Sequence, residues 1–405
     1  MKTFNVPAFY RSPIISAVKN YRKAQDPRKK DLTPTVVDFG AVKYYVARHF
    51  GFCYGVENAI EIAFKALDEN PGKQIYLLSE MIHNPSVNSD LLERGMRFLQ
   101  DTHGNQLISF DELTAEDVVV IPAFGAPVPL LNLLEKKGIK TSAYNTTCPF
   151  VERVWKKSEQ IGKSNHTIII HGKYNHEETR STFSRSELDS KAVLVIRDLK
   201  EAQQLEKYIF GLATQAEFEI EFANKFSKGF NVGTDFDKIG VINQTTMLAT
   251  ETQEIAEYIK QLLIKKFGEA NIKEHYADTR DTLCYATNEN QDATGGLLNV
   301  EADLAIVVGG YNSSNTSHLV ELCERKFKTF FISSASEIEN PSRIHHFNYP
   351  LKKLETTENY LPHSNPLRVV ITSGASCPDS MLEEIMIKIN SFFKERINSD
   401  YKLSS

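Results

Sequence analysis

Three of the five cysteines in this 405-residue chain stand directly before a predicted helix. Cys53 lies in HFGFCYGVENAIEIA, Cys148 lies in NTTCPFVERVW with Pro149 in the first helical turn, and Cys284 lies in DTLCYATNENQDA. Free N–H groups and the positive end of the helix dipole favour a thiolate at such a position. Because the thiolate is the form that binds metals, the repeated placement predicts a shared metal site.

The spacing of these cysteines indicates which metal group they could hold. There is no CxxC motif, which disfavours a zinc ribbon, a thioredoxin site and a bacterial ferredoxin cluster. Separations near the length of a domain suggest one ligand from each of three α/β units. Three thiolates on a cubane iron–sulfur cluster leave one iron open, and such an iron can bind a substrate oxygen and pass electrons to it.

The other two cysteines are weaker candidates. Cys377, in GASCPDS, also precedes a predicted helix and could be a fourth ligand that closes the site. Cys323 lies inside the helical segment ELCERKF and is interpreted as structural. A lone buried cysteine is commonly just a small hydrophobic residue, and this is the alternative for each of the others.

Polar clusters follow five predicted strands, at the position where α/β proteins bind ligands. Hydroxyls, amides and imidazoles provide many donors with few fixed charges, which suits a diphosphate. The alternative is that these residues form turns and helix caps. Glu178 is a candidate proton donor if burial raises its pKa; otherwise it belongs to a solvated acidic turn. The clusters are His83–Asn84, His176 with Glu178, Gln244–Thr245–Thr246, Asn312–Ser313–Ser314–Asn315, and Ser376.

Composition and charge exclude several classes of protein. Charged residues make up 24% of the chain and apolar residues 41%, as in ordinary folded domains. The net charge of −5 gives no overall positive field to attract nucleic acid. No apolar run approaches the roughly 18 residues that a membrane helix needs. The length, at roughly 150 residues per domain, predicts a globular protein of two to three domains.

Short β-rich runs alternate with helical stripes from residue 42 onward, which predicts α/β layers. Helical stripes start near Val56 and follow Cys148, Thr250 and Asp379. The predicted strands are Ile75–Ser79, Val118–Pro122, Thr167–His171, Ala192–Arg197, Ile239–Ile242, Leu304–Val308, Thr329–Ser333 and Val369–Thr372.

Two stretches depart from this alternation. Residues 1–40 are predicted to be an extension, and residues 1–30 carry eight Lys and Arg against one acid, Asp26. Without the apolar core of a secretory signal, and with few cysteines, this is interpreted as a basic arm on a cytoplasmic protein, a transit peptide being the alternative. Residues 205–236 are Phe-rich, and four phenylalanines recur every four residues. They predict a helical insertion docked on the core; the alternative is a partner surface.

Eight motifs resemble, in order, those of the 4-hydroxy-3-methylbut-2-enyl diphosphate reductase family, which acts last in the non-mevalonate isoprenoid pathway. The resemblance covers about residues 45–390 and includes all three helix-opening cysteines, so it is specific. It is greatest to the longer cyanobacterial and plant forms. The motifs are GFCYGVENAI, IHNPSV, TTCPFVERV, NHEET, QTTM, CYATNENQ, YNSSNTSHL and GASCPD.

The resemblance implies a three-lobed, trefoil-like arrangement of three α/β domains around one central 4Fe–4S cluster. Its ligands would be Cys53, Cys148 and Cys284, with one iron left open. Glu178 would deliver a proton, with Thr245 or Thr246 and Thr287 assisting its relay and the substrate hydroxyl. The residues that would hold the substrate diphosphate are His83, His176, Ser313, Ser314, Asn315 and Ser376.

The implied reaction is a two-electron, two-proton reductive dehydroxylation that yields isopentenyl and dimethylallyl diphosphates. Reduced ferredoxin or flavodoxin is the expected electron donor, since nothing resembles a GxGxxG dinucleotide motif. We expect a monomer or weak dimer without nucleic-acid or membrane partners. The alternatives from other classes are a non-catalytic iron–sulfur sensor that uses the same three cysteines, and a zinc-stabilised binding protein.

Two positions depart from the family pattern. Phe124, in PAFGAP, stands where many members have a histidine, so one substrate contact must be lost or supplied elsewhere. Cys377 stands where the family usually has no thiol; if it is not a ligand, it is an oxidation-prone neighbour of Ser376. The predicted domains are a basic extension (1–40), three α/β domains (41–147, 148–283 with its insertion, and 284–395) and a tail (396–405).

Overall fold

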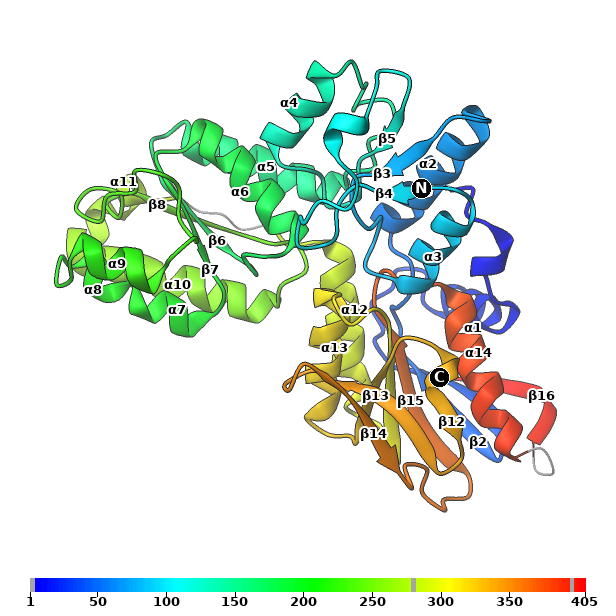
Figure 1. Cartoon of the computed structure of the whole chain (residues 1–405). Coiled ribbons are helices and arrows are strands. Elements are labelled where there is room, and N and C mark those ends of the chain that lie inside the picture. Colours follow the sequence, from blue (N-terminus) through cyan, green and yellow to red (C-terminus); the bar gives the residue numbers. More distant parts are fainter. Residues whose placement is uncertain (1–3, 278–281, 394–396) are drawn as a thin grey trace. The chain divides into compact units, whose positions relative to one another are not determined.

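The computed structural model describes residues 4–277, 282–393 and 397–405, which fold into two compact units (Figure 1). Unit 1 comprises Met1–Glu57, Ile82–Asp90 and Tyr285–Ser405. Unit 2 comprises Asn58–Met81 and Leu91–Cys284. Unit 1 is therefore assembled from both ends of the chain, whereas most of unit 2 is one continuous segment.

A six-stranded sheet forms the centre of unit 1, in the order β11-β10-β15-β2-β1-β16. The first four of these strands run parallel, and the last two add antiparallel at one edge. β10 and β15 are buried along almost their whole length, which explains their near-continuous apolar sequences. The strands are β1 (Thr35–Gly40), β2 (Val42–Val46), β10 (Leu304–Val308), β11 (Thr329–Ile332), β15 (Leu367–Ser373) and β16 (Ile397–Ser404).

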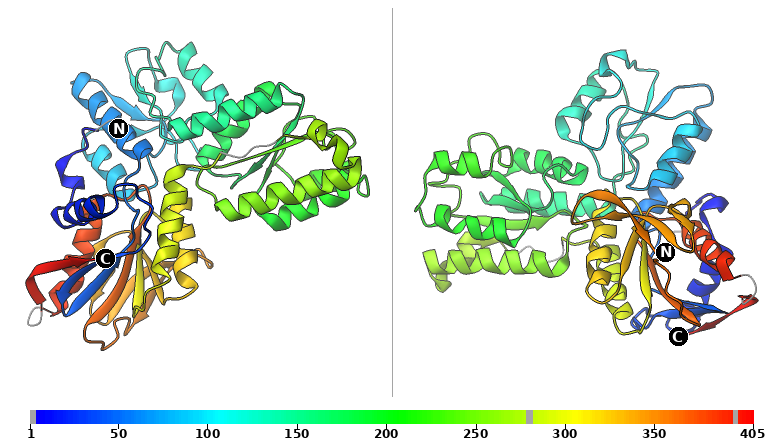
Figure 2. Two further views of the ribbon diagram at one scale, coloured as in Figure 1. Left: turned by 180° about the vertical axis from the view of Figure 1, so that it is seen from behind. Right: turned by 60° about the horizontal axis from the view of Figure 1, so that its bottom comes forward.

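Helices cover both faces of this sheet (Figures 1 and 2). α1 (Pro13–Gln25) packs beside α14 (Asp379–Asn390) on one face, and α12 (Tyr285–Leu297) packs beside α13 (Ser314–Glu324) on the other. A small antiparallel sheet of β12 (Ile338–Asn340), β13 (Arg343–Asn348) and β14 (Lys353–Glu358) completes the unit. Its 3-10 turns are η1 (Ala8–Tyr10), η4 (Ala335–Glu337) and η5 (Ser391–Phe393).

The two chain ends contribute more to unit 1 than the sequence indicates. β1 lies within the predicted extension, yet it pairs with β2 and, on its other side, with β16 from the predicted tail. β1 alternates buried and half-buried residues, and Asp38 and Gly40 interrupt its apolar character. The sequence therefore lacks the continuous apolar run that identifies the central strands. The predicted boundary at residues 395 and 396 lies outside the described residues.

A four-stranded parallel sheet, in the order β7-β6-β8-β9, forms one layer system of unit 2. Ile168 and Ile170 of β6 pack with Val154 and Ile161 of α5 (Pro149–Gly162), whereas Ile169 joins a second core. Successive strand residues point to opposite faces, so helices must cover both. The strands are β6 (Thr167–His171), β7 (Val193–Ile196), β8 (Ile239–Asn243) and β9 (Tyr276–Ala277).

The helices of this part follow the predicted stripes. α10 (Ala249–Phe267) buries Ile255, Ile259, Leu262 and Leu263 in the second core. Figure 1 shows α5 and α6 on one side of β6, β7 and β8, and α7 and α10 on the other. The remaining elements are α6 (Glu177–Asp189), α7 (Leu199–Gln204), α8 (Glu206–Ile209), α9 (Gln215–Glu221), η3 (Glu269–Asn271) and α11 (Ile272–His275).

Unit 2 also contains a three-stranded parallel sheet, in the order β4-β3-β5. Its strands are short, and a separate hydrophobic core that includes Leu78, Leu99, Val119 and Leu134 surrounds them. The elements are α2 (Tyr54–Glu69), β3 (Ile75–Leu77), α3 (Pro85–Glu93), β4 (Arg97–Phe98), η2 (Phe110–Glu112), β5 (Val118–Val120) and α4 (Val128–Lys136). α2 and α3 each begin in unit 1 and end in unit 2.

The Phe-rich insertion is docked on the core, as predicted, but its phenylalanines do not share one helix face. α9 ends at Glu221, and Asn224 then adopts a left-handed conformation (φ 64°), which ends the helical repeat. The Phe218 ring nevertheless lies 5.2 Å from that of Phe222 and 4.8 Å from that of Phe230. All three rings are buried, so they form core rather than a partner surface.

All eight predicted strands are confirmed, with ends that differ by a few residues at most. The fold is therefore mixed α/β, as predicted. The three-lobed arrangement and the predicted domain boundaries stay predictions. In the part of the chain that the structure describes, no helix is long and apolar enough to cross a membrane.

Candidate functional site

Cys53 follows β2 in unit 1, immediately before α2 begins at Tyr54. Its backbone N–H donates to the carbonyl of Ala375, with an N–O distance of 3.1 Å. Ala375 lies in the loop that follows β15, the strand beside β2 in the sheet. The Cys53 loop is therefore fastened to the carboxyl end of the neighbouring parallel strand, where α/β proteins place ligands.

The same β15–α14 loop brings three of the predicted substrate residues together. Ser376 Oγ donates to the carbonyl of His83 at 3.0 Å, and the Ala375 N–H donates to Asn315 Oδ1 at 3.0 Å. His83 is buried, and a side chain at Gly310 would collide with its carbonyl. Main-chain contacts thus fix where these residues lie.

The N-terminus of α13 supplies a set of buried donors. Ser313 caps the helix by accepting from the Thr316 N–H, and Ser314 and Asn315 are buried in its first turn. Among the described residues, Asn315 Nδ2 has no hydrogen-bond partner although it is buried. A helix N-terminus with an unsatisfied donor is a favourable environment for an anionic oxygen.

Thr287 lies in the first turn of α12 and is buried. One turn further along, Asn290 Nδ2 lies 3.5 Å from Asn315 Oδ1. This contact links α12 to the N-terminus of α13. Thr287 therefore belongs to the same part of unit 1 as the predicted diphosphate residues.

Cys148 stands at the N-terminus of α5 in unit 2, as predicted, and its N–H donates to the carbonyl of Ala123 at 2.9 Å. Burial raises the pKa of its thiol to about 12, although the backbone N–H groups of Phe150 and Val151 lower it. The Cys284 thiol and the Glu178 carboxylate raise this pKa further. The helix terminus acts in the expected direction, but burial outweighs it.

Glu178 lies in the first turn of α6 and is almost completely buried. Its carboxylate accepts from the Thr245 N–H at 2.5 Å and from the Thr245 hydroxyl at 2.8 Å. The Thr245 carbonyl in turn accepts from the Cys284 N–H at 3.4 Å. Unit 2 therefore places a carboxyl group, a hydroxyl group and a candidate metal ligand in one hydrogen-bonded chain.

His176 caps α6, because its Nδ1 accepts from the Glu178 N–H at 3.1 Å. The Phe124 ring meets the imidazole edge-on, with ring centroids 5.6 Å apart. Phe124, at the position where many members of the resembled family have a histidine, thus contacts another predicted substrate residue. It packs against that residue instead of offering a donor of its own.

Several polar residues at strand ends are structural, as the capping alternative predicts. Asn84 accepts from the Val87 N–H and caps α3. Gln244 accepts from the Lys173 N–H and the Thr179 hydroxyl. Thr246 accepts from the Gln244 side chain, so it is Thr245 that contacts the Glu178 carboxylate.

The remaining cysteines are both buried in the core of unit 1. Cys377 Sγ lies 3.7 Å from the carbonyl of Pro378 and 3.8 Å from Met381 Sδ. Burial raises the pKa of the Cys377 thiol. Cys323 is likewise buried, in α13, which agrees with a structural role.

The donor set fits an iron–sulfur group. None of the five cysteines forms a disulfide, and three of them stand at the starts of helices. Cys148 and Cys284 interact electrostatically within unit 2, and both carry backbone contacts that fix their positions. In the described ranges, no three His, Cys, Asp or Glu side chains gather closely enough to hold a single metal ion.

Asn290 and Thr316 are two site residues that the sequence analysis does not identify. Thr316 Oγ1 donates to Ser313 Oγ at 3.0 Å, and a side chain at Gly309 or Gly374 would collide with that hydroxyl. Asn290 lies inside the helix predicted after Cys284, and Thr316 directly follows the polar cluster that ends at Asn315, so neither position stands out. The signal that could find them is an uncharged polar residue at the buried positions of an otherwise apolar stripe.

Buried donors at the carboxyl ends of parallel strands, together with thiols at helix starts, are typical of α/β proteins that bind an anionic ligand and a metal group. The family model described as "LytB protein" matches residues 44–390. The chain belongs to the LytB family.

Curated relatives extend over most of the chain. The 4-hydroxy-3-methylbut-2-enyl diphosphate reductase of a Synechococcus species is 41% identical over 352 residues, which cover 86% of this chain and 85% of the relative. The reductase of the same name from Prochlorococcus marinus is 38% identical over 386 residues, covering 92% and 93%.

Two solved structures share the fold. One, of an (E)-4-hydroxy-3-methyl-but-2-enyl diphosphate reductase, has a TM-score of 0.52 and 23% identity and covers 86% of this chain and 99% of that chain. The other, of an E-1-hydroxy-2-methyl-but-2-enyl-4-diphosphate reductase from Plasmodium falciparum, has a TM-score of 0.60 and 21% identity, covering 86% and 87%.

Proposed function

We propose that this chain reduces 4-hydroxy-3-methylbut-2-enyl diphosphate in the last step of the non-mevalonate isoprenoid pathway. The substrate takes up two electrons and two protons, its C–O bond breaks, and water leaves. The products are isopentenyl and dimethylallyl diphosphates. Reductases named for this activity cover most of the chain at about 40% identity, and the sensor alternative finds no support among them.

A 4Fe–4S cluster is the cofactor of this reaction, with Cys53, Cys148 and Cys284 as its ligands. When bound, it supplies electrons and a Lewis-acidic iron for the substrate hydroxyl. Three cysteines outside disulfides, each at a helix start, support this assignment. Cys377 is not included, because its sulfur contacts Pro378 and Met381 within the core.

The diphosphate is bound by His83, Ser313, Ser314, Asn315 and Ser376, together with His176. The unsatisfied Asn315 Nδ2 and the α13 N-terminus provide donors for phosphate oxygens. Binding energy from this non-reacting part of the substrate positions the C–O bond. Thr287, which is buried on α12, lies on the hydroxyl side of the substrate.

Glu178 delivers the proton that joins the leaving hydroxyl. The Thr245 hydroxyl donates to Glu178 Oε2 and can accept another hydrogen bond, so it can pass protons to and from the carboxyl group. The second proton joins either end of the allylic system, which gives two isomeric products. The contact between Glu178 and Thr245, beside Cys284, is the observation that carries the proposal.

An anaerobic visible spectrum tests this function, taken before and after dithionite and then after adding the diphosphate substrate. We expect a brown protein that bleaches on reduction and is reoxidised by substrate, with iron and sulfide in equal amounts. A cluster that ignores the substrate would favour the sensor. A protein that stays colourless after anaerobic reconstitution with iron and sulfide would overturn the assignment of the cysteines.

A further inference from the structure

The N-terminal segment of unit 1 packs directly on the loop that carries Cys53. The Phe4 ring meets Tyr54 edge-on, with centroids 4.8 Å apart, and the Tyr10 ring meets Phe52 at 5.7 Å. Phe52 and Tyr54 are the two neighbours of Cys53 in the sequence. The segment is therefore held against the loop of a candidate cluster ligand.

α1 and the turn after it are fixed at the same place. Lys19 Nζ forms an ion pair with Asp379 at 2.8 Å and lies 5.1 Å from the centroid of the Phe50 ring. The Arg48 guanidinium donates to the carbonyl of Asp26 at 3.0 Å. These contacts hold residues 19–26 beside the strand end that leads to Cys53.

A cavity of about 520 Å³ opens between this segment and the Cys53 loop, entirely within unit 1. Its lining includes Cys53 itself, Lys23 and Lys29 from the N-terminal segment, and Tyr285 from the start of α12. Cys53 is only half-buried. A partner molecule can therefore approach the Cys53 loop through this cavity.

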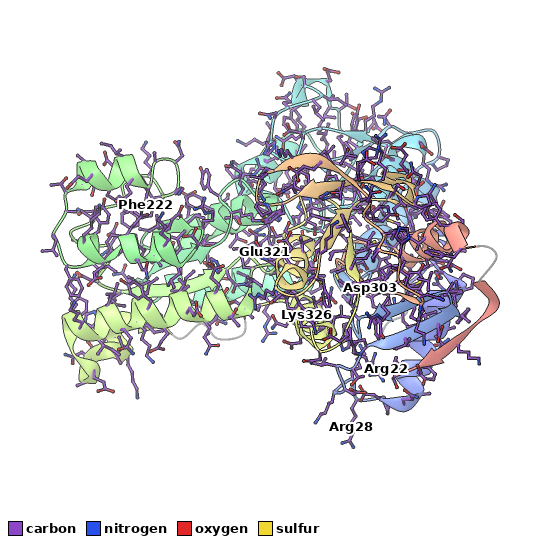
Figure 3. All side chains as sticks on the ribbon, turned by 90° about the horizontal axis from the view of Figure 1, so that it is seen from below. Arg22, Arg28, Phe222, Asp303, Glu321 and Lys326 are labelled. Atoms are coloured by element: carbon purple, nitrogen blue, oxygen red, sulfur yellow. The ribbon has the colours of Figure 1, made fainter. Side chains whose placement is uncertain are left out.

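Lysine and arginine side chains line the opening (Lys19, Lys23, Lys29 and Arg48) together with three acids, Asp26, Glu57 and Glu289. Within the described ranges, the exposed side chains of Lys23, Arg28, Lys29 and Lys30 form no ion pair, unlike Lys19, Arg22 and Arg48. Figure 3 shows Arg28 reaching out from the ribbon into solvent. The chain as a whole carries −5, so this positive face is a local feature.

We propose that this face, defined by Lys23, Arg28, Lys29 and Lys30 and here called the basic face, docks a small acidic one-electron carrier protein that reduces the cluster through the Cys53 loop. The proposal rests on the proposed function. Each encounter oxidises one carrier by one electron, so two reduced carriers are consumed for every substrate hydroxyl that leaves as water.

Charge and exposure favour this occupant. Electron-transfer complexes are small and transient, and complementary charge raises their association rate more than their affinity. Flexible unpaired lysines suit such an encounter, because they attract an acidic surface without fixing one geometry. Electron transfer also weakens steeply with distance, and the basic face borders a candidate ligand of the cluster.

Steady-state kinetics with two reductants test the proposal. The triple variant Lys23→Glu, Arg28→Glu, Lys29→Glu is compared with wild type, using either reduced methyl viologen or a plant-type [2Fe–2S] ferredoxin as donor. We expect an unchanged rate with viologen and a KM for ferredoxin raised by about tenfold or more. Wild-type KM should also rise with added KCl, whereas the variant's should change little.

Lys328→Glu is the matched control. Lys328 is exposed and directly precedes β11, at the amino ends of the parallel strands, whereas Cys53 follows the carboxyl end of β2. An unchanged KM for ferredoxin in the triple variant would contradict docking at the basic face. An equal rise in this KM in Lys328→Glu would contradict it as well. So would loss of binding to phosphatidylserine vesicles in the triple variant with an unchanged ferredoxin KM.

The two proposals can fail separately. If wild type turns over with neither reductant, the proposed function fails, and calorimetry of the oxidised ferredoxin with each variant still tests docking. If wild type turns over with viologen and the triple variant binds ferredoxin as tightly as wild type, only the docking surface fails. The neutral variant Lys23→Gln, Lys29→Gln should show a smaller change in the same direction.

Discussion

Unit 1 and unit 2 hold their candidate site residues in different ways. In unit 1, the Cys53 N–H, the Ser376 hydroxyl and the Ala375 N–H are joined through main-chain groups, and Asn315 Nδ2 is left as an unsatisfied donor. In unit 2, the central contact is between two side chains: the Thr245 hydroxyl donates to the Glu178 carboxylate at 2.8 Å. In the proposed function, unit 1 binds an anion and unit 2 moves a proton.

Removal of one candidate cluster ligand should have the largest effect. Ser substitution of Cys53 in unit 1, or of Cys148 or Cys284 in unit 2, should abolish stable cluster binding, because each removes one of three thiolates. Cys377→Ala should retain the cluster, since that sulfur lies in the core. Iron and sulfide analysis of anaerobically purified protein is the measurement. Full iron occupancy in all three Ser variants would contradict the ligand set.

Glu178→Gln tests the proton role of unit 2. Turnover should fall by roughly 10²–10⁴, the range for loss of a general acid, while cluster content and substrate binding persist. Thr245→Val should reduce turnover less, and Thr246→Val least, because the Thr246 hydroxyl contacts Gln244 instead. Single-turnover kinetics with pre-reduced enzyme separate these effects from electron supply. Near-normal turnover in Glu178→Gln would remove this residue from the mechanism.

Asn315→Ala and Ser376→Ala test the binding role of unit 1. Hydrogen bonds to charged groups contribute about 1.5–3 kcal/mol, so KM should rise roughly ten- to a hundredfold with little change in kcat. Ser336→Ala, at an exposed position, serves as the control in the same unit. If these variants lowered kcat as strongly as Glu178→Gln does, the division of labour between the units would be wrong.

Phe124→Ala should have the smallest effect. Removing the ring frees the His176 imidazole, which it contacts edge-on, and we expect a rise in KM of a few fold. Phe124→His restores the side chain found in many family members and should lower KM if it adds a donor to the substrate. Equal KM values for wild type and both variants would show that the Phe124 contact does not orient His176.

The buried parallel strands were predictable because both of their faces are covered. β10 is apolar at every position, and the three central residues of β6 are isoleucines, so both strands can be recognised from their own sequence. β1 was not predicted, because only one of its two faces is buried. In addition, its pairing with β16 joins residues from opposite ends of the chain. A contact between residues so far apart leaves no local pattern in the sequence.

The sequence predicts which residue types form the candidate site, but not which of these side chains contact one another. Cys148 was identified by its position before a helix, and Glu178 by its position after a strand. The choice between Thr245 and Thr246 depends on which hydroxyl faces Glu178, which adjacent residues of the same type cannot indicate. The burial that raises the pKa of the Cys148 thiol depends on side chains distant in sequence.

The central position of β15 has a consequence for biosynthesis. β15 lies between β10 and β2, so the sheet of unit 1 cannot close until residue 373 has been synthesised. The acceptor for the Cys53 N–H, the Ala375 carbonyl, emerges from the ribosome later still. Most of unit 2 can fold during translation, because domains fold as their residues emerge. We therefore expect the proposed iron–sulfur centre, which includes Cys53, to mature only on the completed polypeptide.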